Sequence, residues 1–84
     1  MAVVKLFGAI GDIAGWSEAT LAGVTLEEIK AAVAGGDVRL AEHLDHRSTL
    51  VILNATLIPH SLRCEALKIG DDDEVAFGSP VGGG

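Results

Sequence analysis

The sequence has little of what small proteins use to cross-link themselves or to bind nucleic acid. It contains a single cysteine, Cys64, no tyrosine, and six basic residues against twelve acidic ones, for a net charge of −6. One cysteine excludes a disulfide framework and a four-cysteine zinc site. The shortage of basic residues argues against a nucleic-acid partner, because phosphate binding needs a basic surface, and it favours a basic protein partner.

Long apolar runs are also missing. No run approaches the roughly 20 residues of a transmembrane helix, and Lys5 and Asp12 interrupt the apolar start of the chain, which argues against a signal peptide. A lone cysteine fits a reducing compartment. We therefore expect a cytoplasmic protein with no membrane partner. A length of 84 residues allows one domain, and a hydrophobic content of 49% excludes disorder for most of it.

Runs of β-branched and aromatic residues predict the strands. These runs cover residues 2–8, 17–23, 48–54, 56–59 and 74–77. The unbroken apolar stretch at 50–53 is typical of a central strand that is covered on both faces or nearly so. Asn54-Ala55 suits a two-residue turn, since asparagine tolerates positive φ, and Pro59 confines the strand before it to an edge or an end.

Helix signals are clearest after Thr25. Thr25 with Glu28 three residues later predicts a capping box, in which each side chain accepts from the other residue's amide. Gly35-Gly36 ends this helix, and Asp37 is the expected cap of a second, shorter one. A single helical turn is expected at 9–14. The order of elements predicts an α+β fold: a mixed sheet of four to five strands on one main helix, with the first and last strands side by side in the middle.

No constellation of catalytic side chains stands out. His43 and His46 have a spacing that can share a metal on a helix, but a solvated polar segment explains them better, and we expect no metal site. His60 and Cys64 resemble a thiol–base pair without an orienting group. Asp71 to Glu74 lacks the ligand spacing of a calcium loop and predicts a solvated turn, and Trp16 is expected to be a packing residue.

The glycine-rich end of the sequence is the remaining candidate. We expect a folded domain over residues 1–78 and a flexible tail over 79–84, which ends in Gly82-Gly83-Gly84. Such a tail has two interpretations: a frayed end without function, or a narrow segment that enters a tunnel and presents its carboxylate with no Cβ in the way.

Five segments, in order along nearly the whole chain, resemble the small subunit of molybdopterin synthase, a ubiquitin-like sulfur carrier of the MoaD/ThiS type. They are Leu6-Phe7-Gly8-Ala9, Thr25-Leu26-Glu27-Glu28-Ile29, Val51-Ile52-Leu53-Asn54 with Thr56-Leu57, Asp73-Glu74-Val75-Ala76-Phe77, and Pro80-Val81-Gly82-Gly83-Gly84. Each is weak alone, but the run from Asp73 to Phe77 leading into the glycine end is fairly specific.

The resemblance implies a β-grasp fold and a chemistry at the chain end. A ubiquitin-activating-type enzyme would use ATP to adenylate Gly84, and sulfur would then convert it to a thiocarboxylate. The loaded end would enter the large synthase subunit and supply the molybdopterin dithiolene. No cofactor would stay bound and no side chain of this protein would be catalytic. Gly82 and Gly83 would give clearance. The expected partner-binding residues are Phe7, Leu57, Phe77, Pro80 and Val81.

Departures from the family keep other interpretations open. The family often has two adjacent phenylalanines in the first strand and again near the last, and here Gly8 and Gly78 occupy the second position of each pair. A carrier for thiazole, cysteine or another sulfur pathway, a modifier that joins Gly84 to a target lysine, and an interaction module with an inert tail remain alternatives. Cys64 has no role that the resemblance supplies.

Overall fold

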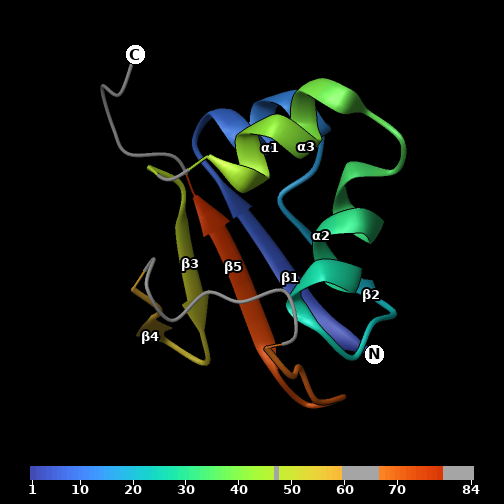
Figure 1. Cartoon of the computed structure of the whole chain (residues 1–84), viewed down its shortest axis with the longest axis vertical. Coiled ribbons are helices and arrows are strands. Elements are labelled where there is room, and N and C mark those ends of the chain that lie inside the picture. Colours follow the sequence, from blue (N-terminus) through green and yellow to red (C-terminus); the bar gives the residue numbers. More distant parts are fainter. Residues whose placement is uncertain (47, 60–66, 79–84) are drawn as a thin grey trace.

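Alternating apolar residues build one mixed five-stranded sheet in the order β2-β1-β5-β3-β4 (Figure 1). The computed structural model describes residues 1–46, 48–59 and 67–78. The strands are β1 (Ala2–Phe7), β2 (Glu18–Leu21), β3 (Leu50–Leu53), β4 (Thr56–Leu57) and β5 (Glu74–Gly78). The helices are α1 (Ala9–Ala14), α2 (Leu26–Ala34) and α3 (Val38–Asp45). The predicted α+β class is confirmed.

The first and last strands lie side by side in the interior of the sheet, as predicted. β1 and β5 are parallel, and their arrows point the same way in Figure 1. β2 pairs antiparallel with β1, while β3 pairs antiparallel with both β5 and β4. β4 is at an edge, which agrees with the restriction that Pro59 imposes on the strand before it. Asn54 and Ala55 both have positive φ, 51° and 68°, in the predicted turn between β3 and β4.

The helices cover one face of the sheet and enclose the core. Each helix buries an apolar stripe against the inward side chains of β1, β3 and β5. The core residues are Ala2, Val4, Leu6, Ile10, Leu26, Ile29, Val33, Leu40, Leu44, Val51, Ile69, Val75 and Phe77. The other face carries no helix in the described part of the chain. The cover is uneven on β3: Leu50 is 38% exposed and Ile52 is half-buried, so the strand is covered fully on the helix side and only in part on the other.

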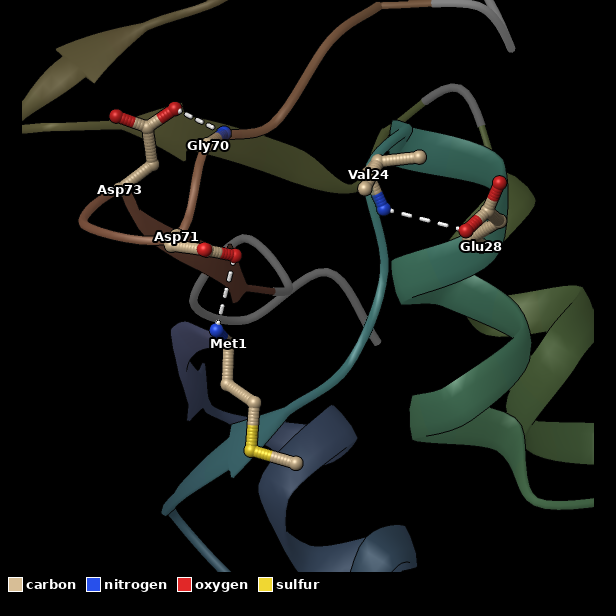
Figure 2. A network of polar contacts seen from close by, with 6 residues as sticks. All are labelled: Met1, Val24, Glu28, Gly70, Asp71 and Asp73. Atoms are coloured by element: carbon tan, nitrogen blue, oxygen red, sulfur yellow. Dashed lines mark hydrogen bonds and ion pairs between the residues drawn. The ribbon is translucent and has the colours of Figure 1, made fainter.

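The N-terminus of α2 confirms half of the predicted capping box. Thr25 Oγ1 accepts from the backbone N–H of Glu28 at 3.2 Å. The Glu28 carboxylate, however, accepts from the N–H of Val24 at 3.2 Å, one residue earlier than expected (Figure 2). The segment before the helix is held in a strand-like bridge, in which Ile69 N–H donates to the Val24 carbonyl at 2.9 Å and Thr25 faces Lys68. This pairing fixes the backbone so that the Val24 amide is the one within reach.

The ends of the helices follow the sequence signals. α2 ends at Gly35, whose φ of 55° is left-handed and therefore favours glycine. Asp37 caps α3 by accepting from the N–H groups of Arg39 and Leu40 at 2.9 and 3.2 Å. The connection from α3 to β3 is closed by Thr49, a buried residue whose hydroxyl donates to the His43 carbonyl.

Candidate functional site

The face of the sheet that carries no helix in the described residues has a row of apolar residues near the C-terminal end of β5. Strand register places Gly78 beside Phe7 on one side and Leu50 on the other. In the next row Ala76 has Ile52 as its neighbour, and Ile52 pairs with Leu57. We call this set the apolar face; it consists of Phe7, Leu50, Ile52, Leu57, Ala76 and Gly78.

Two members of the apolar face are exposed more than large apolar residues usually are. Phe7 is 52% exposed and Leu57 is 54% exposed, and they come from strands on opposite sides of β5. Ala76 and Gly78 between them are buried, so Phe7, Leu50 and Leu57 carry the exposed apolar surface of this face. Exposed apolar surface of this kind marks interaction sites in soluble proteins. Phe7 and Leu57 were predicted as partner-binding residues, and their position makes them available for that role. Leu50 and Ile52 were missed because the run from 50 to 53 has no polar alternation to show which side faces outward.

The structure corrects the prediction that Phe77 binds a partner. The Phe77 side chain is 0% exposed and belongs to the core. It pairs with Leu6 and Val51, both of which point toward the helices. The alternation of β5 carried the signal: Glu74 and Ala76 share one face, so Val75 and Phe77 share the other. A charged residue at one end of the pattern indicates the outward side.

Gly8 and Gly78, which stand where the family often has a second phenylalanine, differ in what the backbone requires. Gly8, at the start of α1, has φ 64° and ψ −144°, a region that is nearly restricted to glycine. A second aromatic residue there would force this turn to change. At Gly78 a Cβ would lie 3.4 Å from Phe7 Cβ, which is ordinary contact, and no unusual φ is required. Phe7 therefore lies directly beside the position where the chain leaves the sheet.

A polar group borders the apolar face on the same side of the sheet. Lys5 Nζ lies 2.6 Å from the Glu74 carboxylate, and both side chains are about two-fifths exposed. The hydrogen bond and the charge of Glu74, with a smaller contribution from Glu18, raise the pKa of Lys5 above its ordinary value of 10.5. The two charges neutralise each other, so the apolar face lies next to a paired cation rather than a free one.

Asp73 fixes the beginning of β5. Its carboxylate accepts from the Asn54 side-chain amide at 2.9 Å and from the N–H of Gly70 at 2.7 Å (Figure 2 shows the Gly70 contact). These two hydrogen bonds lower the pKa of Asp73 below its ordinary value of 3.8. Asn54 in turn accepts from the N–H of Glu74 at 2.9 Å. The β3–β4 turn and the start of β5 are thereby joined, which holds the rows of the apolar face in register.

The chain continues from Gly78 into the predicted tail. Gly78 is the last described residue, at the end of β5 in the middle of the apolar face. The predicted tail residues Pro80, Val81, Gly82, Gly83 and Gly84 lie outside the described residues. The predicted division at 78/79 stays a prediction.

The other sequence candidates form no metal site in the part of the chain that the structure describes. Among the described residues no group of His, Cys, Asp and Glu side chains could hold a metal ion. His60 and Cys64 lie outside the described residues. Trp16 is half-buried and packs against the core, as expected of a packing residue. None of the helices in the described ranges has the length and apolar character needed to cross a membrane.

The fold is that of the ubiquitin-like β-grasp proteins, and the chain belongs to the ThiS family, the ubiquitin-like sulfur carriers of the MoaD/ThiS type. The family matches residues 4–84, which is almost the entire sequence. This confirms the resemblance inferred from the motifs. No curated protein matches the chain significantly.

Three solved structures share the architecture. The small archaeal modifier protein 1 from Methanosarcina acetivorans has a TM-score of 0.78 at 23% identity, covering 99% of this chain and 95% of its own. The protein of the same name from Haloferax volcanii has a TM-score of 0.72 at 22% identity, over 99% and 98%. Mycobacterium tuberculosis CysO, described as an antigen, has a TM-score of 0.77 at 19% identity, over 96% and 100%. At these identities the likeness establishes the fold.

Proposed function

We propose that this chain is the sulfur-carrier subunit of a molybdopterin synthase, acting through a thiocarboxylate at Gly84. The observation that supports the proposal most is the position of Gly78, which puts the glycine-rich end of the sequence directly after the apolar face. A partner that docks on Phe7 and Leu57 would receive the following residues at the same surface. Membership of the ThiS family supports the sulfur chemistry.

The proposed chemistry has two steps at one carbonyl carbon. The Gly84 carboxylate attacks the α-phosphorus of ATP on a ubiquitin-activating-type enzyme, and pyrophosphate leaves. Hydrosulfide, supplied by a sulfur donor, then attacks the carbonyl carbon of the acyl-adenylate, AMP leaves, and loss of the sulfur-bound proton gives the thiocarboxylate. The large synthase subunit would accept the loaded end, where the thiocarboxylate sulfur would form a C–S bond to a pterin precursor and displace an oxygen leaving group. Water would then cleave the acyl–sulfur bond and return the Gly84 carboxylate. ATP is a substrate of the activating enzyme in this scheme, and this chain holds no cofactor.

The residues divide between docking and delivery. Phe7 and Leu57 would supply the apolar contact to the partner, and Pro80 and Val81 would extend it along the tail. Gly82 and Gly83 have no Cβ, which would let the chain end pass through a narrow channel. We propose that the partner enzymes supply the catalytic residues. The cytoplasm is the proposed location.

Two alternatives share the same fold and chain end. The chain could carry sulfur for thiazole, cysteine or another pathway. It could instead modify proteins through an isopeptide bond between Gly84 and a lysine, and two of the similar structures are named modifier proteins. A covalent adduct to lysine in cells would favour the modifier, while co-purification with a molybdopterin synthase large subunit would favour the main proposal.

Intact-mass measurement tests the proposed step at Gly84. The chain is incubated with ATP, an adenylating enzyme and a sulfur source, and we expect one oxygen to be replaced by sulfur at the terminus. A variant lacking Gly84 and a variant with one residue added after it are the controls, and neither should gain sulfur although both should fold. An unchanged mass with several competent adenylating enzymes would contradict the proposal.

A matched pair of variants tests docking on the apolar face. Leu57→Ser removes an exposed apolar side chain from that face, and Val38→Ser removes one from α3, where Val38 is also exposed. We expect only Leu57→Ser to weaken binding to the large subunit, measured by calorimetry with both purified proteins. Equal weakening by the two variants, or none by either, would exclude the apolar face as the docking surface.

A further inference from the structure

A concave surface lies on the helical side of the molecule, between α2 and α3. Buried Leu26 and Leu44 form its floor, and Ala34, Ala41 and exposed Ala31 form its walls and rim. Its volume is about 230 Å³, which is below the roughly 300–1,000 Å³ of small-molecule pockets. The groove is therefore the size of one inserted side chain rather than of a cofactor. The side chains of Ala31, Ala34 and Ala41 are too small to fill this space.

The charges around this groove are predominantly acidic. Glu27, Lys30 and Asp45 complete its lining, and Lys30 Nζ lies 3.1 Å from Asp45 across the two helices. Among the described residues, that ion pair neutralises Lys30 and leaves Glu27 without an ion-pair partner. The imbalance extends beyond the groove, because residues 25–46 contain five acidic and two basic side chains. An anionic surface around an apolar depression selects a cationic partner with an apolar anchor.

We propose that the α2–α3 groove binds a basic peptide segment of a partner protein, with one leucine-sized side chain inserted over Leu26 and Leu44. Lysine or arginine residues flanking that anchor would lie near Glu27, since Asp45 is already paired with Lys30. The groove is on the opposite side of the sheet from the apolar face, so both surfaces can be occupied at once. The proposal does not depend on the chemistry at Gly84.

The test uses the intact chain and a fluorescein-labelled amphipathic peptide composed of leucine and lysine. Binding is measured by fluorescence anisotropy and located by amide chemical shifts. Ala31→Leu adds a side chain at the rim of the groove. Ala32→Leu makes the same change at an exposed neighbour on α2 that does not line it. We expect Ala31→Leu to weaken binding roughly tenfold or more, since the anchor would lose its site, and Ala32→Leu to leave affinity unchanged.

Charge is tested separately, so that the proposal does not rest on one variant. Glu27→Gln should lower the affinity about two- to fivefold, as expected for an exposed charge contact, and added salt should weaken binding of the unmodified protein. A peptide with glutamate at each lysine position should not bind. The proposal is overturned by no binding, by shifts confined to the apolar face, by equal binding of the glutamate peptide, or by equal affinities of the Ala31 and Ala32 variants. Self-association of the free chain that Ala31→Leu abolishes would also overturn it, because a second copy would then occupy the groove.

Discussion

Phe7 and Phe77 offer a direct test of which side of the sheet each residue faces. In the parallel strands β1 and β5, Phe7 pairs with Gly78, and Phe77 pairs with the preceding residue of β1. Phe7 is nevertheless 52% exposed, while Phe77 is 0% exposed. Truncating a buried phenylalanine to alanine costs about 3–5 kcal/mol, since transfer and cavity terms add. A domain of 84 residues has a total stability of roughly 4–13 kcal/mol. Phe77→Ala should therefore remove a large part of the free energy of unfolding.

The milder variant Phe77→Leu keeps the experiment measurable. It should cost about 1–2 kcal/mol, because less of the side chain is deleted, and each kcal/mol should lower Tm by about 4–8 °C in a domain of this size. Phe7→Ala should change stability by about 0.5 kcal/mol or less, as for other exposed positions. Urea unfolding followed by the fluorescence of Trp16, the single tryptophan, measures all three.

Partner binding provides the second half of this test. If the apolar face is the docking surface, Phe7→Ala should weaken binding to the large subunit while the unfolding midpoint stays nearly unchanged. Phe77→Leu should lower the midpoint while binding below that midpoint is retained. Equal destabilisation by Phe7→Ala and Phe77→Ala, or a Phe77→Leu variant as stable as the original protein, would show that the burial of Phe77 is misassigned.

Three further predictions concern local contacts. Glu28→Ala removes the acceptor of the Val24 N–H and should lower stability by a few tenths to about 1 kcal/mol in urea unfolding; an unchanged midpoint would mean that this cap is not formed. Asp73 has a lowered pKa in the folded state, so its contribution to stability is present above its ordinary pKa of 3.8 and is lost as pH falls through the lower folded-state value. Asp73→Asn should therefore reduce the loss of Tm on acidification, and an identical pH profile would refute the assignment. Gly8→Ala should cost about 1–3 kcal/mol because of its backbone conformation, while Gly78→Ala should be tolerated, since its Cβ would make ordinary contact with Phe7; thermal melts of the two variants compare them, and equal effects would contradict the explanation.

Much of the local structure follows from short-range sequence signals. Thr25 and Gly35 delimit α2 as a capping residue and a left-handed glycine should. Asn54-Ala55 forms the expected turn, and Pro59 agrees with an edge position for β4. These signals act through groups within a few residues of each other, so they operate even in a chain that has not yet folded.

The glycine-rich end and the family motifs are also properties of the sequence alone. The identity and order of these residues indicate a ubiquitin-like sulfur carrier, and the match over residues 4–84 confirms that family.

Tertiary structure decided which side chains are available at the surface. Phe77 is buried because β5 lies between β1 and β3 with one face against the helices, and Leu50 is exposed because the opposite face of the sheet has no helix over it in the described residues. The Asp73–Asn54 contact joins residues that are 19 positions apart in the sequence. In the α2–α3 groove, Lys30 and Asp45 are 15 positions apart. Apolar runs such as 50–53 do not reveal which neighbours will cover them. That depends on how the strands and helices are packed together, and this arrangement exists only in the folded chain.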